Sequence, residues 1–477
     1  MIKIPKMYTN DYRIGDFYKE NTDVSVYVNG EKCPVHNCLC SPIPFNRVFP
    51  GYQRDINQTE PAYFVTFSSN EPVTLRVKMD IAYDKCVIRP LSKNIKHTVE
   101  GDEVVFTLTE NGSYSFELSD NHNVLHIFNN PVKEYPDAEK ATYYFGPGVH
   151  FPSTIFLKDN DTVYIDEEAI VFGSLFTEGA QNVRIYGGGI LDNSTEERVS
   201  EHCYTKDTKG NFRIYNSKNI NLEDIILVNS SNWVVCMFYC ENINIDNIKI
   251  VGHWRYNADG IDICNSSNVT IKNSFIRSFD DTISIKGIYE YQGNIENIVV
   301  DNCVLWCEWG HTCELGVETM AKTYRNITFK NCDVIHISGP AMAIQNGNYA
   351  DIHNICFENI NAELQSYILP PVLQENDEMV YNGYGNPHDL IFIRLNNEQY
   401  RPRTENEFGY THNIHFKNVN AYTDCENIKP CIIVQSYDEN TVFKNIEIDG
   451  LYLNKVKQNS FDNFKTTFEN TENITLK

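Results

Sequence analysis

Hydrophobic and polar residues alternate in short segments over the first 140 residues. Apolar side chains occupy every second position in Val24–Val28, Tyr63–Phe67, Val73–Met79 and Val104–Leu108. A period of two is that of a β-strand with one buried face. The turn-forming pairs Asn29-Gly30 and Asn111-Gly112 lie outside these segments, as in antiparallel sheets. We therefore predict an accessory β-sandwich domain over residues 1–140, with a linker at 129–136 and no catalytic residues.

The pattern changes from about residue 145 to a recurring phrase, Asn-(Ile/Val)-x-apolar. The phrase begins at Asn182, Asn219, Asn242, Asn268, Asn297, Asn326, Asn354, Asn413 and Asn445. Successive members are 37, 23, 26, 29, 29, 28, 59 and 32 residues apart. Apolar strands that recur with a period in the twenties, with Asn at the corners, are typical of a solenoid.

The phrases predict a right-handed parallel β-helix over residues 141–477, so that the whole chain is all-β. Val269–Asn273 and Ile327–Asn331 show the alternation, in which apolar residues fill the interior and polar residues face outward. The 59-residue interval holds an insertion at about 361–410 that is rich in Pro, Tyr and Asn. A long loop beside a solenoid face often forms one wall of a binding groove.

Composition and charge narrow the possible partners. The 477 residues are 42% hydrophobic and 22% charged, and 64 acidic residues against 40 basic ones give a net charge of -24. Nucleic acid and anionic membranes need clustered Lys and Arg, so we expect neither as a partner. There is no run of 18 apolar residues, so no membrane-spanning helix is expected. The first residues lack the apolar core of a secretory signal, which favours a cytoplasmic location.

The 15 cysteines do not suggest a metal site. Cys33, Cys38 and Cys40 lie close together, but no second pair completes a zinc-binding set. We expect buried or surface thiols instead, and no cofactor.

Three carboxylates carry the candidate chemistry. Asp259 precedes Asp280 by 21 residues, close to one repeat, and Asp281 follows directly. Adjacent coils would bring these groups together, and their repulsion should raise one pKa. A carboxyl with a raised pKa can act as a general acid while an ionised neighbour activates water. Inverting glycoside hydrolysis needs that pair, roughly 6.5–9.5 Å apart. On the residues alone, two solvated turns explain the same motifs equally well.

Side-chain parity supports an outward-facing site. Ile283 and Ile285 should point into the core, which places Asp280, Thr282, Ser284 and Lys286 on the outer face. Asp281 has the parity of the apolar residues, so we expect the strand to bend near it.

The combination of motifs resembles glycoside hydrolase family 28, the polygalacturonase-like enzymes of the pectin-lyase-like superfamily. The motifs here are Asn257–Asp262, Asp280–Lys286 and Trp309–Thr312, within a resemblance that covers about 145–360. The resemblance implies that Asp280 is the general acid. It implies that Asp259 and Asp281 hold and deprotonate the attacking water, and that His311 assists near the acid.

Two positions depart from the family pattern. Thr312 replaces the last Gly of the family's Gly-His-Gly. The family's Arg-x-Lys, which grips a galacturonate carboxylate, is replaced by a segment containing Gln345 and Asn346. Amides suit hydroxyl groups better than carboxylates, although Arg394, Arg401 or Arg403 of the insertion could substitute. The layout of a β-sandwich followed by a β-helix with three aspartates also resembles glycoside hydrolase family 49, the dextranase-like enzymes.

Other residues around the motifs complete the predicted substrate site. Before Asp259 come Trp254, Arg255, Tyr256 and Asn257, which could line a sugar subsite or simply pack. Lys286 could contact substrate or pair with Asp280. The remaining candidates are Glu314, Glu318, Gln345, Asn346 and Arg394.

The sequence thus predicts an inverting glycosidase that acts on a pectin-type carbohydrate. A dextranase-like hydrolase of neutral α-glucans, a polysaccharide lyase and a non-catalytic carbohydrate-binding β-helix stay open as alternatives. A lyase would need Ca²⁺ and a basic residue to remove the C5 proton, for which only Lys286 is well placed. The sequence makes no prediction of the oligomeric state.

Overall fold

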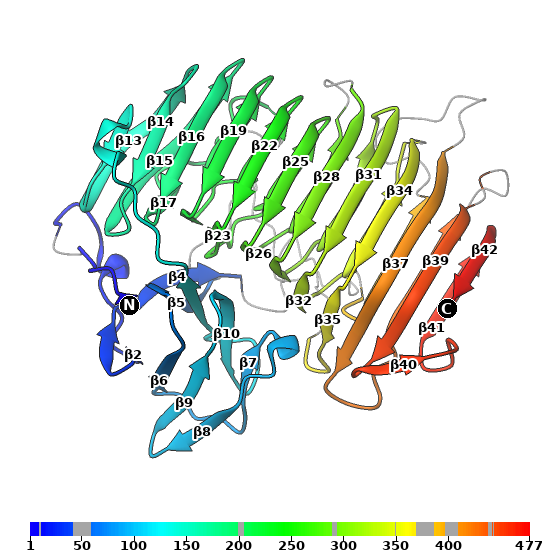
Figure 1. Ribbon diagram of the computed structural model, residues 1–477, viewed down its shortest axis with the longest axis horizontal. Coiled ribbons are helices and arrows are strands. Elements are labelled where there is room, and N and C mark those ends of the chain that lie inside the picture. Colours follow the sequence, from blue (N-terminus) through cyan, green and yellow to red (C-terminus); the bar gives the residue numbers. More distant parts are fainter. Residues whose placement is uncertain are drawn as a thin grey trace, which may run out of the picture.

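A computed structural model describes residues 1–8, 11–41, 59–198, 205–288, 293–348, 350–368, 386–395, 409–436, 441 and 443–477. In Figure 1, a small domain built from the N-terminal residues lies beneath one side of a long β-solenoid. Within the described residues, the only helices are the short 3₁₀ turns η1 (Asp16–Tyr18), η4 (Leu91–Lys93) and η5 (Ala138–Lys140).

Two β-sheets form the N-terminal domain. One contains β1 (Ile2–Lys3), β4 (His36–Cys40), β5 (Glu60–Ser69), β7 (Cys86–Arg89), β10 (Gly112–Leu118) and β11 (Leu125–Asn130). The other contains β2 (Val24–Val28), β3 (Glu31–Cys33), β6 (Val73–Met79), β8 (His97–Glu100) and β9 (Glu103–Leu108). Alternate residues of both sheets, such as Val26, Leu75 and Phe116, form one apolar core. The pairing is antiparallel except between β5 and β11, which run parallel, because a long connection leaves either direction open.

The solenoid runs from β12 (Tyr143–Phe145) to β42 (Thr471–Leu476) as one 31-stranded sheet wound into a right-handed parallel β-helix, which confirms the predicted fold class. Its first coil holds β12 and β13 (Gly148–Leu157), and these pair with β14 (Thr162–Ile165) and β15 (Ala169–Glu178) of the second coil. Near its end, β40 (Val456–Gln458) forms a hairpin with β39 (Phe443–Leu453). Each strand generally pairs with the third strand after it, so the helix has three faces.

We name the three faces by their roles. The ladder face contains β16 (Gln181–Gly187), β19 (Lys218–Glu223), β22 (Glu241–Asp246), β25 (Ser267–Lys272), β28 (Ile295–Asp301), β31 (Thr323–Lys330), β34 (Asp351–Glu358), β37 (Tyr410–Thr423) and β39 (Phe443–Leu453). The sandwich face contains β17 (Ile190–Asp192), β20 (Ile226–Val228), β23 (Lys249–Ile250), β26 (Phe275–Ser278), β29 (Val304–Cys307), β32 (Asp333–His336) and β35 (Asn361–Leu364). The site face contains β18 (Phe212–Tyr215), β21 (Val235–Phe238), β24 (Ile261–Cys264), β27 (Ile283–Gly287), β30 (Cys313–Thr319), β33 (Met342–Asn346), β36 (Asp389–Leu395), β38 (Cys431–Ser436) and β41 (Lys465–Glu469).

Stacks of identical or similar apolar residues fill the helix interior. On the site face Ile261, Ile283 and Cys313 are successive Cα partners, and all three are fully buried in one continuous cluster. Because each coil repeats the pattern of the one before, the core grows with length and supports a chain larger than an ordinary single core.

Asparagines hold the corners of the coils, as the repeated phrase predicted. All nine phrase asparagines have φ between 54° and 59°, a left-handed conformation that Asn tolerates better than most residues. Their side-chain amides also bond from coil to coil, for example Asn326 Nδ2 to Asn297 Oδ1 at 3.2 Å and Asn297 Nδ2 to Asn268 Oδ1 at 3.0 Å. The corner residue therefore sets both the bend of a coil and its register with the next.

The N-terminal domain packs against the sandwich face through buried apolar and charged groups. Phe64 and Phe128 of the domain share a cluster with Phe275 and Trp306 of the helix. Beside this cluster, Arg89 Nε lies 2.8 Å from Glu117 Oε2, and the same guanidinium pairs with Glu363 of the helix. Ion pairs this deeply buried fix the relative position of two bodies, since breaking one leaves a charge without a partner.

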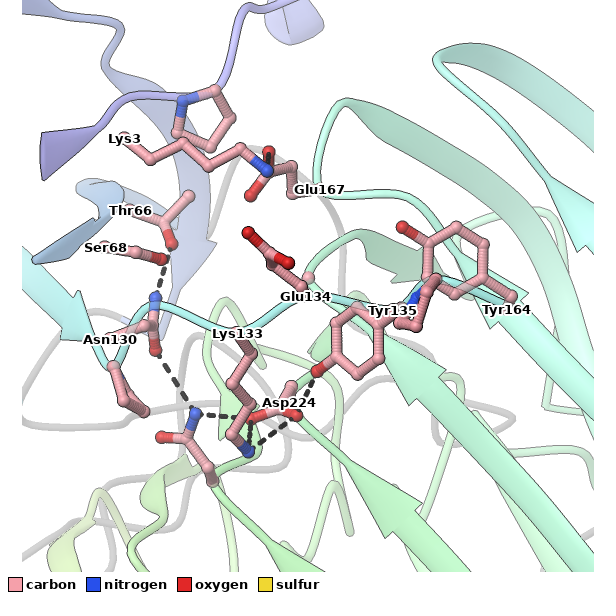
Figure 2. Close-up of a pocket in the computed structure, with 16 residues that line it drawn as sticks. Lys3, Thr66, Ser68, Asn130, Lys133, Glu134, Tyr135, Tyr164, Glu167 and Asp224 are labelled. Carbon is pink, nitrogen blue, oxygen red and sulfur yellow. Dashed lines mark hydrogen bonds and ion pairs between the residues drawn. The ribbon is translucent and has the colours of Figure 1, made fainter. Parts of the chain in front are cut away.

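The linker between the two bodies lines a cleft of about 270 Å³ (Figure 2). Lys133 and the Tyr135 hydroxyl of the linker both bind Asp224 of the helix, the latter at 2.5 Å. These contacts tie the linker to the solenoid at the edge of the domain interface.

None of the helices in the described ranges is both long and apolar enough to cross a bilayer. Every cysteine in that part of the chain is a free thiol, and Cys33, Cys38 and Cys40 are buried.

We predict that Asn326→Ala lowers thermal stability, because alanine is strained in the left-handed region by about 1–2 kcal/mol and loses the bond to Asn297. Asn326→Gly is the matched control, since it loses the same bond without the strain. Thermal melts should rank wild type above the glycine variant and the glycine variant above the alanine variant. Equal midpoints for the two variants would contradict a role for the backbone conformation.

Candidate functional site

The candidate site is built on three successive turns that lead from the sandwich face into the site face. Asp259, Asp281 and His311 each stand two residues before the Cα partners Ile261, Ile283 and Cys313, so they occupy equivalent positions on adjacent coils. Backbone bonds from Gly260 N to Asp281 O and from Thr282 N to His311 O, both 2.8 Å, fix this alignment.

The alignment refines the predicted pairing by one residue. Asp281, rather than Asp280, is the positional equivalent of Asp259, and Asp280 is the additional residue in its turn. The strand β27 begins only at Ile283, so both aspartates lie in the bend that parity required. Ile283 and Ile285 point into the core as predicted, whereas Thr282 is also fully buried and bonds to Ser278 and Trp306.

Lys286 lies at the centre of the acidic cluster. Its Nζ is 2.8 Å from Asp259 Oδ2, 2.8 Å from Asp262 Oδ1 and 3.3 Å from Asp281 Oδ2. Burial works against the charge of Lys286, but the surrounding carboxylates raise its pKa well above the usual range. Lys286 is therefore a fixed cation that offsets part of the acidic charge, and it does not make the predicted ion pair with Asp280.

The pKa values of Asp280 and Asp281 are shifted in opposite directions. Burial, and then the charge of Asp281, raise the pKa of Asp280 well above that of an ordinary aspartate. Burial also opposes ionisation of Asp281, but Lys286 and His311 outweigh it and hold the pKa of Asp281 below its usual value. One turn thus carries a carboxyl with a raised pKa directly beside one with a lowered pKa.

Among the described residues, no Lys, Arg or His side chain lies within ion-pair distance of Asp280, and its contacts are hydrogen bonds. Its Oδ1 accepts the Asp281 backbone N–H at 3.0 Å, and its Oδ2 lies 3.3 Å from the Asn257 amide nitrogen. Asn257 has φ 56°, and its own Oδ1 accepts from Arg198 at 2.9 Å. Arg198 therefore orients the amide that contacts Asp280, the predicted acid.

Gly310 fits directly against this pair of aspartates. A Cβ at Gly310 would lie 2.5 Å from Asp280 Oδ1, 2.5 Å from Asp281 Oδ1 and 2.6 Å from the Asp281 backbone nitrogen. Any side chain here would displace the backbone of the turn. Because Asp280 Oδ1 and Asp281 Oδ1 both lie 2.5 Å from the same point, these two oxygens are no farther apart than twice 2.5 Å.

His311 connects Asp281 to a further buried acid. Its Nδ1 is 3.1 Å from Asp281 Oδ1 and 3.4 Å from Glu314 Oε2. Burial alone would lower the pKa of His311, but Glu314 and Asp281 raise it well above 6.5. Burial and Asp281 in turn raise the pKa of Glu314 to about 7. His311 therefore contacts Asp281 rather than the predicted acid Asp280.

Gln345 completes the surroundings of His311. Its Nε2 lies 3.0 Å from His311 Nε2 and donates to Glu314 Oε1 at 2.8 Å. The structure thus joins two residues predicted as substrate contacts, Glu314 and Gln345, to the histidine instead. Glu314 is almost completely buried, so its role is to position His311.

Asp281, His311 and Glu314 also bring metal-binding atoms within 4.8 Å of one another. The ammonium of Lys286, 3.3 Å from Asp281, adds a positive charge that a metal ion would have to overcome. The arrangement therefore suits proton transfer better than metal binding.

Three predicted substrate contacts are corrected by their surroundings. Asn346 is fully buried and bonds to Thr319 and Ala350, because its side chain closes a turn at the end of β33. Arg255 is buried and donates to the backbone oxygen of Glu196 at 2.8 Å. Trp254 is buried beside Arg255. Trp254 and Arg255 thus support the loop before Asp259, and none of the three side chains lines an open subsite.

Arg394 stands where a basic residue could serve the site. It is the Cα partner of Gln345 on the next coil of the site face, and paired positions in a parallel ladder project to the same side. Glu318, another candidate, is half-buried, and its backbone oxygen accepts the Tyr324 hydroxyl. Arg401 and Arg403 lie outside the described residues, as does most of the insertion.

Sequence reasoning missed several residues of the site. Asp262 was part of the quoted motif, and its place on β24, one coil before Ser284, signals an outward carboxylate. Phe279 and Trp309 were missed as well. They form an aromatic cluster around the turns with Tyr256, which the sequence does predict as a possible subsite residue, and the Tyr256 and Trp309 rings are 5.5 Å apart. Nothing in the spacing signals Arg198, because it comes from a distant coil.

Comparison with known proteins supports the resemblance drawn from the motifs. The sequence model of Glycosyl hydrolases family 28 matches residues 145–381. The chain is 25% identical over 157 residues to the probable rhamnogalacturonase B of Aspergillus terreus, which covers 33% of this chain and 28% of that protein. It is 30% identical over 160 residues to the exopolygalacturonase of Oenothera organensis, and that match covers 31% of this chain and 42% of the relative. The matches thus span less than half of either relative's length.

The whole layout has a counterpart among solved structures. Dex49A from Penicillium minioluteum, a structure of family 49, aligns with 99% of this chain and 89% of its own, with a TM-score of 0.57 and 15% identity. At that identity the likeness concerns the fold alone. Together the comparisons confirm that the β-helix resembles family 28, a family of glycoside hydrolases.

We predict that Gly310→Ala abolishes most hydrolytic activity, because the new methyl group forces Asp280 and Asp281 apart. Gly15→Ala is the matched control, since its Cβ would have no atom within 4 Å and its φ of -76° is ordinary. Gly15→Ala should melt like the wild type and keep its activity. Gly310→Ala should melt somewhat lower because of the overpacked turn, stay folded by circular dichroism, and lose at least about 100-fold in kcat/KM. Full activity of the first would show that the turn is not part of the reactive site.

Proposed function

We propose that this protein hydrolyses glycosidic bonds of a pectin-type oligo- or polysaccharide by general acid–base catalysis. The observation that carries the proposal is that Asp280 and Asp281 meet at Gly310 while Lys286 and His311 pair with Asp281. These contacts shift the pKa values of the two carboxyl groups in opposite directions. Cleavage of a glycosidic bond needs an acid for the leaving oxygen and a carboxylate for the water or the sugar carbon.

Asp280 is the proton donor in this proposal. Burial and the charge of Asp281 raise its pKa, which favours the protonated form, and its side chain is oriented by Asn257 and by the Asp281 backbone. When the glycosidic oxygen leaves, Asp280 transfers its proton to that oxygen and becomes ionised.

Asp281 is the base. It is 13% exposed at the side chain, and Lys286 and His311 keep it ionised. It takes a proton from water as the water oxygen attacks the anomeric carbon. Asp259 is only 2% exposed and bonds to Lys286, so we assign it the task of holding that cation in place.

The distance between the Asp280 and Asp281 carboxyl groups bears on whether the anomeric configuration is inverted or retained. At least one pair of their oxygens lies within twice 2.5 Å, below the roughly 6.5–9.5 Å common in inverting enzymes and near the 5–5.5 Å of retaining ones. A covalent sugar on Asp281 would, however, require it to leave the hydrogen bonds from His311. We therefore propose inversion, with the water bound beside Asp281.

A lyase mechanism fits the site less well. The lyase reaction needs a neutral base to remove a proton, and Lys286 is buried among carboxylates that raise its pKa. Its proton is bound too tightly to leave Lys286 free as a base.

The substrate class rests on the relatives and on Arg394. Relatives of the chain are a probable rhamnogalacturonase and an exopolygalacturonase, whose names refer to galacturonate-containing polymers. Gln345 occupies the place expected for a basic residue, and Arg394 is its partner on the next coil. We propose that Arg394 binds the substrate carboxylate through its guanidinium fork. Tyr256 and Trp309 offer aromatic surface for a sugar ring.

We predict that Asp280→Asn abolishes turnover but leaves substrate binding intact, because asparagine keeps the shape of the side chain but supplies no acidic proton. Asp449→Asn, on the exposed surface of β39, is the control and should retain full activity. Reducing-end release and calorimetric binding of the same oligogalacturonide measure the two quantities. Undiminished turnover by Asp280→Asn would overturn the proposed acid.

The wild-type reaction adds two readouts. Its kcat/KM should fall as pH rises through the raised pKa of Asp280, because the acid then loses its proton, and Asp280→Asn should lack that alkaline limb. Proton NMR should detect the product first as the inverted anomer. Initial formation of the retained anomer would instead make Asp281 a nucleophile.

We predict that Arg394→Gln raises KM for oligogalacturonides by about tenfold or more, since a charge-assisted pair contributes roughly 1.5–3 kcal/mol. Arg394→Lys should restore only part of the affinity because lysine lacks the fork. Arg76→Gln, in the N-terminal domain and paired with Glu103, is the control. If neutral α-glucans are cleaved instead and Arg394→Gln has no effect on them, the dextranase-like alternative is favoured.

A further inference from the structure

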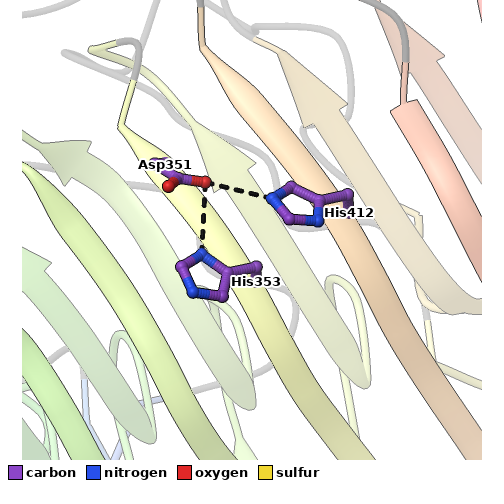
Figure 3. A group of neighbouring side chains, drawn as sticks. All are labelled: Asp351, His353 and His412. Carbon is purple, nitrogen blue, oxygen red and sulfur yellow. Dashed lines mark hydrogen bonds and ion pairs between the residues drawn. The ribbon is translucent and has the colours of Figure 1, made fainter.

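A cluster of two histidines and one aspartate lies on the ladder face, away from the candidate active site on the site face. Asp351 and His353 belong to β34, and His412 belongs to β37 on the next coil (Figure 3). His353 and His412 are Cα partners. Two parallel strands therefore present the imidazoles side by side on a rigid support.

The three side chains converge on one point. Asp351 Oδ1 lies 3.2 Å from His353 Nδ1 and 3.3 Å from His412 Nε2, and one potential ligand atom from each residue falls within 4.8 Å of the other two. Ligands bound tetrahedrally to one zinc ion at about 2.0–2.1 Å are roughly 3.3 Å from each other. Both distances to Asp351 already match that value.

We propose that Asp351, His353 and His412 form a binding site for one divalent transition-metal ion of the zinc class. Two imidazoles and one carboxylate favour zinc, nickel or copper over magnesium and calcium. The facing ring nitrogens, which now share Asp351 Oδ1, would turn to the ion. The rings are stacked at 5.1 Å with 14° between their planes, so each must tilt about its broad χ2 torsion.

The charges around the cluster permit a cation. Arg325 and Lys444 flank the histidines along the same ladder. Arg325 pairs with Glu296 on its far side, and Lys444 Nζ lies 3.2 Å from Glu472 on its far side. Both cations are thus engaged by carboxylates that are not part of the cluster. The ligand side chains are 20–41% exposed, so an ion can reach them from solvent and keep water ligands.

The position of the cluster suggests what the ion would do. Asp351 and His412 are 61 residues apart in sequence, and the long insertion of the helix lies between them. An ion bound to both strands would join the coils on either side of that insertion. A ligand that binds only the folded state raises its stability by mass action, so metal should protect these coils from opening.

The test uses the full chain without a histidine tag, stripped with chelator and titrated with zinc chloride in a calorimeter. We expect one saturable site, a higher melting temperature with zinc, and little heat with magnesium or calcium. His353→Ala, His412→Ala and Asp351→Asn should each weaken binding at least as much as the roughly 10–100-fold seen when partners of metal ligands are lost. All three should leave glycoside hydrolysis unchanged.

Two control variants separate this site from other sources of binding. His415→Ala removes a histidine from the same strand β37 that faces Cys356 and Glu447 instead, and should bind zinc normally. His311→Ala removes the other group of potential ligands, around Asp281, and should also bind normally. Absence of saturable binding, or binding lost in His311→Ala but kept in the His353→Ala/His412→Ala double variant, would overturn the proposal.

Discussion

The register between coils is the constraint on which the rest of this structure depends. Parallel pairing aligns Ile261, Ile283 and Cys313, and corner asparagines with left-handed backbones hold the bends in place. A slip of one residue would turn inward-facing side chains outward. The same alignment sets Asp259, Asp281 and His311 on neighbouring turns and sets His353 beside His412. Both candidate sites are thus consequences of one repeated geometry.

Charge balance, rather than the mere presence of carboxylates, gives the candidate active site its chemistry. Four aspartates and Glu314 gather around Lys286 and His311, mostly out of solvent. Asp259, Asp262 and Asp281 each lie within bonding distance of Lys286. Asp280 is next to the cluster but outside that set, so burial dominates and its pKa rises. Gly310 maintains the contact, because only a residue without a side chain leaves room for both carboxyl groups.

The N-terminal domain is attached close to the reactive turns. Arg277, three residues before Asp280, pairs with Glu308, three residues before His311, at 2.7 Å. His126 of the domain lies 3.1 Å from Arg277 Nη1, and its ring packs against Phe275 and Trp306. The domain therefore supports the face of the helix from which the site turns emerge, which gives an accessory domain a structural role in the arrangement of the site.

The sequence by itself determined the β-helix, the asparagine corners and the residues of the acidic turns, because period-two alternation and a repeat in the twenties are local patterns that every coil restates. It also identified Gln345 and Arg394 as the residues to consider in place of the missing basic pair. Tertiary structure alone decided which groups meet. Lys286 pairs with Asp259, Asp262 and Asp281 and not with Asp280. The Asn346 side chain is buried, where it closes a bend. His353 lies beside His412, although a long insertion separates them in sequence. Those outcomes depend on coil register and on burial, neither of which is contained in the spacing of residues along the chain.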